Sequence, residues 1–179
     1  MKLQITIFSV ILLFIFSGCE YDNFDEPASI LSGRVVYNNT PVGVRTNGTQ
    51  LELWQHGYQL FVKIPVYIAQ DGTFSATLFD GDYKLVRLSG APWEAQSSDT
   101  ISVTVKGNTT LDVPVKPYFT VGDESYNKSG SIITTKFKVS KVSDEADLQS
   151  VRIYLGKSIL TDNNKYEGVK DVDLALVDL

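Results

Sequence analysis

The sequence predicts an all-β chain in which a β-sandwich is followed by a second, smaller β domain. From Ala28 onward, apolar and polar residues alternate with period 2, the segments are rich in Val, Ile, Thr, Tyr and Phe, and Gly and Asn interrupt them at short intervals. Such a pattern is typical of short strands joined by turns. No stretch after Ala28 carries a convincing apolar stripe with helical spacing. About seven short strands are expected before Lys116, which favours a sandwich or barrel.

The first residues resemble a bacterial lipoprotein signal. Lys2 precedes an apolar run that ends at Phe16, as in an export signal, and the run is shorter than the roughly 20 residues that cross a bilayer comfortably. Phe16-Ser17-Gly18-Cys19 resembles a lipobox, although Leu is commoner at the position of Phe16. We therefore expect a signal peptide at 1–18 and lipidation of Cys19, the only cysteine of the chain. The alternative is an ordinary secretory signal with a coincidental cysteine.

Residues 19–28 are predicted to form an acidic tether that ends near Pro27. An acidic cluster directly after the lipid cysteine resembles the surface-export signal of Bacteroidota lipoproteins. That resemblance implies an outer-membrane lipid anchor with the cargo facing the cell exterior, and the alternative is a plain spacer. The net charge of −5 disfavours nucleic acid, which calls for a basic surface.

The strands of the first domain follow from the alternation. We expect strands at 32–37 and 49–55, with Leu51 and Leu53 on one face and Trp54 on the other. Two hairpins are expected next, one around Asp71-Gly72 and one around Lys106-Gly107-Asn108, with Asp80-Gly81-Asp82 as a further tight turn between them.

These turns carry a family resemblance. The phrases Ser32-Gly33-Arg34-Val35, Pro41-Val42, Asp71-Gly72-Thr73-Phe74 and Asp80-Gly81-Asp82-Tyr83-Lys84-Leu85 resemble the transthyretin-like, or carboxypeptidase-regulatory-like, β-sandwich repeat and the N-terminal domain of the DUF3823 lipoproteins of Bacteroidota. The resemblance implies a sandwich at 29–117 and a tyrosine, Tyr83, packed back over the sandwich edge after a glycine corner. It implies a fold more than a function.

Residues 118–179 resemble the beginning of the immunoglobulin-like second domain of the same family. Residues 118–129 are polar enough for a boundary or loop, and strands are expected around Phe137 and Ile153. About 60 residues are fewer than a full sandwich requires. We expect a small or truncated domain, in which the tail from Val169 forms a strand without partners.

Catalytic and metal chemistry find little support in the sequence. His56 is the one histidine and has no ligand-spaced neighbour, which argues against zinc and a Ser-His-Asp triad. Paired carboxylates such as Asp80 with Asp82 lie at predicted turns, where Asp bonds to the local backbone. No phosphate or dinucleotide motif occurs. We predict no enzyme activity, no catalytic or metal-binding residue and no cofactor.

The aromatic residues favour binding. Trp54 is expected to face outward beside Tyr58 and Phe61, and Trp93 is expected in an exposed loop. Exposed rings with polar neighbours are suited to sugar rings or partner surfaces. Trp54, Tyr58 and Trp93 are therefore the candidate ligand-binding residues, and the alternative is that both tryptophans pack within the protein.

Three functions remain open. The resemblance to DUF3823 proteins implies a non-catalytic surface accessory of a glycan-uptake system, with glycan and outer-membrane uptake proteins as partners. A structural or adhesive stalk without a small ligand is the alternative. An enzyme would require a polar pocket with perturbed carboxylates.

Overall fold

The computed structural model describes residues 25–45, 47–57, 61–88, 90, 92–95 and 100–177. The predicted signal peptide 1–18, Cys19 and Tyr58 lie outside these residues, so the roles assigned to them stay predictions. Residues 25–28 are exposed and form no strand. Within the described ranges, no helix has both the length and the apolar character needed to cross a membrane.

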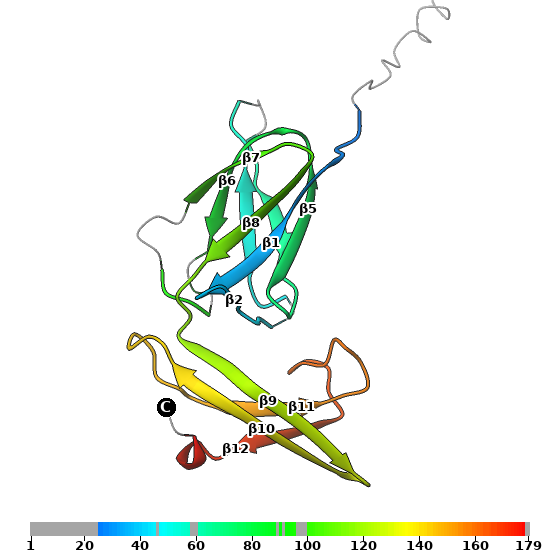
Figure 1. The fold of residues 1–179 in the computed structure, drawn as a ribbon, viewed down its shortest axis with the longest axis vertical. Helices are drawn as coiled ribbons and strands as arrows, with labels where there is room; N and C mark the ends of the chain where they lie inside the picture. The colour runs from blue at the N-terminus through cyan, green and yellow to red at the C-terminus, as the bar shows by residue number, and fades with distance from the viewer. Residues whose placement is uncertain are drawn as a thin grey trace, which may run out of the picture.

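The first domain is a sandwich of two four-stranded sheets (Figure 1). In one sheet, the central strand β1 pairs with β2, β5 and β8, and the other sheet has the order β4-β3-β6-β7. The strands are β1 Ser29–Tyr37, β2 Thr40–Pro41, β3 Gln50–Trp54, β4 Ile64–Tyr67, β5 Thr73–Leu78, β6 Gly81–Arg87, β7 Thr100–Val105 and β8 Asn108–Pro114.

Strand β1 holds its sheet together because it has a partner on each side. It runs antiparallel to β5 and parallel to β8, with Gly33 opposite Leu111. A Cβ built on Gly33 would lie 1.8 Å from the carbonyl oxygen of Leu111. The glycine of the Ser32-Gly33 phrase therefore permits the close approach of β1 and β8.

The chain turns at Asp71-Gly72 as predicted, but the pairing of the flanking strands predicted for both hairpins is wrong: at each turn the chain passes from one sheet to the other. Strands β4 and β5 belong to different sheets and share one isolated bridge, Ile68 with Phe74. Strands β7 and β8 are likewise divided between the sheets, and β8 pairs with β1. Both arrangements bury the same apolar rows. In a hairpin those rows lie side by side on one sheet, whereas here they face each other across the core.

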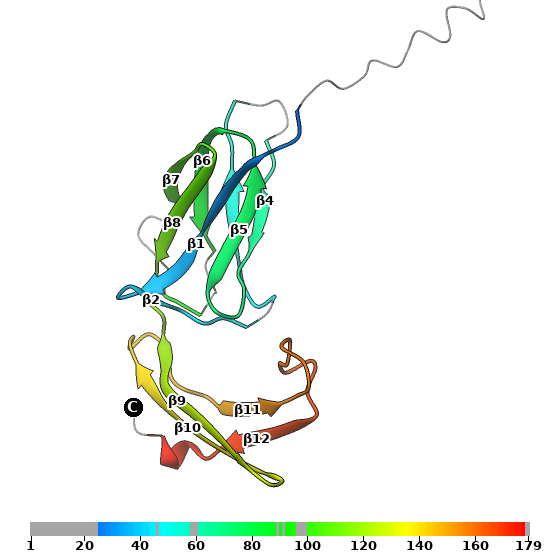
Figure 2. The same ribbon diagram turned by 45° about the vertical axis from the view of Figure 1, so that its right-hand side comes forward.

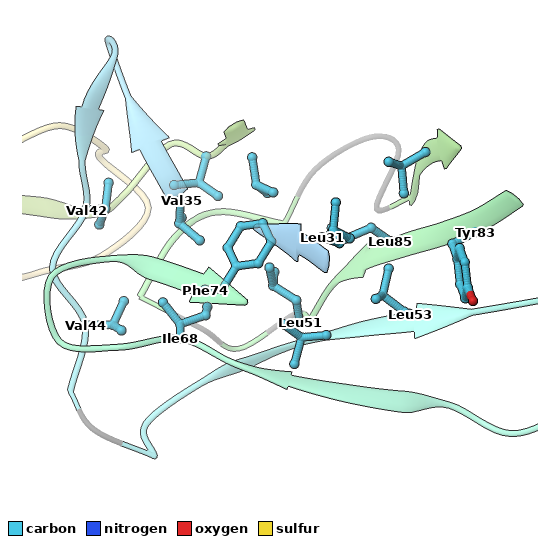
Figure 3. Packing of buried hydrophobic residues seen from close by; sticks show 14 of the residues in the cluster. Leu31, Val35, Val42, Val44, Leu51, Leu53, Ile68, Phe74, Tyr83 and Leu85 are labelled. Carbon is cyan, nitrogen blue, oxygen red and sulfur yellow. The ribbon is translucent and has the colours of Figure 1, made fainter. Parts of the chain in front are cut away.

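The core lies between the sheets, and its rings and branched side chains interdigitate (Figure 3). Leu31, Leu51, Leu53 and Leu85 are fully buried, at 0% exposure. Tyr83 is 3% exposed, and its hydroxyl donates a hydrogen bond of 3.0 Å to the carbonyl of Phe79. The expected packing of Tyr83 over the sandwich edge is thus confirmed.

The second domain consists of two two-stranded sheets (Figures 1 and 2). Strands β9 Phe119–Ser129 and β10 Ile132–Lys141 form a long hairpin, and β11 Val151–Leu155 pairs with β12 Gly168–Val172, which a short 3₁₀ helix Leu174–Leu176 follows. Among its described residues only Val139 and Ser143 are buried. The predicted all-β fold, a sandwich followed by a smaller β domain, is confirmed.

Two local expectations for this domain are wrong. The polar segment 118–129 is not a loop, because its backbone pairs with β10 from Phe119 to Ser129. The tail strand is not unpartnered, because Val172 pairs with Val151. In both cases backbone pairing defines a strand that side-chain composition alone leaves undecided.

A compact network joins the two domains. Trp93 forms an isolated bridge with Pro117, and the Glu94 carboxylate accepts a hydrogen bond from Ser143 of the second domain. The Lys116 ammonium lies 2.7 Å from the same carboxylate, and the hydrogen bond from Lys116 holds the pKa of Glu94 below its usual value. Ser143 is only 2% exposed, whereas the Lys116 side chain is 49% exposed, so the junction is buried on the Ser143 side and open to solvent at Lys116.

Candidate functional site

The outer face of the sheet β4-β3-β6-β7 carries the candidate site. On β3, Leu51 and Leu53 point into the core, so Gln50, Glu52 and Trp54 lie on the opposite face. The strand register places further outward residues beside them: Pro65 and Tyr67 on β4, Lys84 and Val86 on β6, and Ser102 on β7.

An aromatic platform, formed by Trp54, His56 and Phe61, occupies one end of this face. The rings of Trp54 and Phe61 have centroids 4.9 Å apart at 43°, and those of His56 and Phe61 are 4.7 Å apart at 32°. Tilted rings at such separations are a favourable aromatic arrangement. Phe61 is 47% exposed, so the platform offers an apolar surface to solvent.

An ion pair between Glu52 and Lys63 lies next to the platform. Glu52 is 7% exposed, and one of its carboxylate oxygens lies 2.5 Å from the Lys63 ammonium. Its other oxygen accepts a hydrogen bond of 3.3 Å from the Trp54 indole nitrogen. The carboxylate therefore orients the indole ring and is itself neutralised by Lys63, as a nearly buried charge requires.

Two hollows open on the same face as the platform. One, beside His56, is lined by Asp82, Lys84, Ser102 and Thr104 among others. The other lies at the far end of β3, has a volume of about 240 Å³, and is lined by Gln50, Tyr67 and Leu88 with residues 47–49 and Gly90. The outer face thus combines rings, amides and hydroxyls along one surface.

A larger hollow, of about 850 Å³, lies between the loop after β1 and strand β9. Its wall includes Tyr37, Gln70 and Phe119. None of the three ring pairs found in the described part of the chain lies on that wall. The platform is therefore the better-defined candidate.

The predicted site residues differ in their exposure. Trp54 faces outward and contacts Phe61, as predicted. Trp93 is 1% exposed and belongs to the core cluster, so the expectation of an exposed Trp93 is wrong. Trp93 itself forms an isolated bridge with Pro117. Binding through Tyr58 stays a prediction.

Sequence reasoning missed two members of the site. His56 was considered as a possible metal ligand or catalytic base; it is exposed, and its ring packs on Phe61. The Glu52–Lys63 pair was not predicted either. Strand alternation places Glu52 on the same face as Trp54. Lys63 lies beside Glu52 only because β3 pairs with β4 in a register that sets Leu53 opposite Ile64, and this pairing is not evident from the sequence.

Asp80 and Asp82, which were weighed as catalytic candidates, accept hydrogen bonds from residues far away in the sequence, and not from the local backbone as expected. Asp80 accepts from Ser29 and from the backbone amide of Gly107, and the hydrogen bond from Ser29 lowers its pKa. Asp82 accepts a hydrogen bond from Thr104. Within the described ranges, no group of three or more His, Cys, Asp or Glu side chains is placed to hold a metal ion.

Comparison with known proteins agrees with the fold. A crystal structure of a DUF3823 family protein from Bacteroides ovatus is 47% identical, with a TM-score of 0.74 over 82% of this chain and 74% of that one. A DUF3823 family protein from Parabacteroides merdae is 34% identical, with a TM-score of 0.74 over 83% of this chain and 75% of that one.

A more distant crystal structure, of a protein from Bacteroides uniformis, is named as a "putative carbohydrate binding protein". It is 19% identical, with a TM-score of 0.65 over 82% of this chain and 72% of that one, and this likeness shows the fold alone. A comparison with curated proteins finds no match.

Family assignment covers both domains. Residues 29–116 match the N-terminal domain of DUF3823, described as a protein of unknown function. Residues 119–178 match DUF3823_C, described as a domain of unknown function. The chain therefore belongs to the DUF3823 family.

Proposed function

We propose that the protein is a non-catalytic, lipid-anchored surface protein that binds glycans, as an accessory of a glycan-uptake system. The observation that carries the proposal is the aromatic platform of Trp54, His56 and Phe61, held on a sheet face by the Glu52–Lys63 pair. Aromatic rings supply apolar contact area, and the polar groups around them supply the hydrogen bonds that orient a ligand.

The geometry favours binding over catalysis. The acidic side chains Asp80, Asp82 and Glu52 each have a hydrogen-bond or ion-pair partner, and the pKa shift resolved for Asp80 is downward. A general acid that works near neutral pH needs the opposite shift. The Bacteroides uniformis protein of the same fold bears a name that agrees with carbohydrate binding.

The anchor and the uptake role rest on sequence resemblance. Phe16-Ser17-Gly18-Cys19 supports lipidation at Cys19, and the acidic residues that follow support display on the outside of the outer membrane. A Cys19→Ser variant of the full-length chain is expected to lose incorporation of labelled fatty acid and to leave the membrane fraction. Retention of the label in that variant would contradict the anchor.

The binding proposal is tested with a glycan array, using residues 20–179 of the chain and its Trp54→Ala variant. We expect saturable binding to at least one glycan class, which Trp54→Ala lowers about tenfold because it removes the largest ring of the platform. Tyr126→Ala is the matched control, because Tyr126 is 72% exposed on the second domain.

A silent array, or binding that Trp54→Ala leaves unchanged, would contradict a glycan site at the platform. The second candidate function, a structural stalk, then gains support from the junction. Trp93, Glu94, Lys116 and Ser143 tie the domains together, as a spacer requires. A stalk would retain protein partners in a pull-down without binding any glycan.

A further inference from the structure

We infer that the outer face of β3 and β4 is an extended groove for an uncharged, linear oligosaccharide, with a second aromatic contact at Tyr67. This inference rests on the proposed glycan-binding function and adds the length and charge of the ligand. The proposed groove is the strip of this face between the hollow beside Tyr67 and Gln50 and the platform at Trp54 and Phe61.

The spacing of the two aromatic contacts comes from the strand. Tyr67 pairs with Gln50, and Trp54 lies four residues farther along the same face of β3. At roughly 3.3 Å per residue, the two ends are about 13 Å apart. That separation exceeds the reach of a single sugar ring, so one ligand touches both ends only if it is a chain of several sugars.

Tyr67 points away from the core and is available for contact with a ligand. Its side chain is 62% exposed, although it lies in a strand whose neighbour Val66 is 2% exposed. It lines the 240 Å³ hollow together with the Gln50 amide and the apolar side chain of Leu88. A tyrosine beside an amide combines a flat apolar surface with hydrogen-bonding groups.

The charges of this face indicate a neutral ligand. Glu52 is paired with Lys63, and Asp82 and Lys84 bond to Thr104 and Ser102. Two carboxylates and two ammonium groups therefore balance on the face, and the whole chain carries a net charge of −5. A polyanionic glycan would find no positive surplus to bind it.

The test is calorimetric titration of residues 20–179 with neutral ladders of gluco-, xylo- and manno-oligosaccharides, from disaccharide to hexasaccharide, and with oligogalacturonates as anionic probes. In a ladder that binds, affinity is expected to rise with length until both ends of the groove are filled. Tyr67→Ala is expected to lower affinity about tenfold for the long members and to leave the shortest unchanged. Trp54→Ala is expected to weaken every member.

The outcomes separate this inference from the proposed function. Binding that Trp54→Ala removes, but that is independent of length or insensitive to Tyr67→Ala, would overturn the groove and leave the platform as a single subsite. Tighter binding of oligogalacturonates would overturn the neutral ligand. Absence of binding to every ladder would overturn the groove, whereas only a silent glycan array would also overturn the proposed glycan binding. Tyr126→Ala again serves as the exposed-tyrosine control.

Discussion

Replacing Trp93 by alanine tests whether Trp93 is a core residue or a ligand-binding residue. Trp93 is 1% exposed, lies in the core cluster and bridges to Pro117, so the substitution leaves a large cavity where the two domains meet. Large-to-small changes of buried tryptophan cost about 3–5 kcal/mol, against a total stability of about 5–15 kcal/mol for a typical domain. We therefore expect a large fall in the free energy of unfolding.

The assay is urea unfolding of residues 20–179, followed by far-ultraviolet circular dichroism, because the substitution removes one of only two tryptophan fluorophores. Tyr67→Ala is the matched control: Tyr67 is 62% exposed, and its loss is expected to change stability by less than about 0.5 kcal/mol. A loss below about 1 kcal/mol for Trp93→Ala, together with weakened glycan binding, would refute the core assignment.

Three further changes test the fold. Tyr83→Phe removes the hydroxyl that bonds to a backbone carbonyl and is expected to cost about 1 kcal/mol in urea unfolding; no change would contradict that role. Gly33→Ala forces a methyl group into a backbone carbonyl 1.8 Å away and is expected to cost about 1–3 kcal/mol, whereas Gly122→Ala, with open space around it, serves as the neutral control. The folded-state pKa of Glu94 lies below its usual 4.5, chiefly because of the hydrogen bond from Lys116. The contribution of Glu94 to the free energy of unfolding is therefore complete above pH 4.5 and is lost as the pH falls through the folded-state pKa. The difference in melting temperature between the wild type and Glu94→Gln should therefore shrink on acidification, and a pH-independent difference would contradict this linkage.

The sequence predicted the strands better than their pairing. Alternation located β4 and β5, and β7 and β8, because apolar side chains at every second position mark the buried face of any strand. The same alternation fits a hairpin within one sheet and a turn between two sheets. Only long-range pairing distinguishes them, and the parallel pairing of β1 with β8 joins segments separated by more than 70 residues.

The sequence predicts those parts of the site that follow from the alternation of inward and outward side chains along a strand. The outward position of Trp54 follows from the inward positions of Leu51 and Leu53 on the same strand. Trp93 lies in a segment without alternation, so no parity indicated its burial. Its place depends on the path of the chain toward Pro117, which local composition does not encode.

The platform lies near the end of the sandwich at which the chain enters the first strand. Ser29, at the start of β1, bonds to Asp80 just before β6, and the β3–β6 register places Trp54 opposite Lys84 near the same end of the sheet. If Cys19 carries the lipid, as we propose, the ten residues 19–28 span at most about 35 Å. The platform end of the groove then stays near the membrane surface.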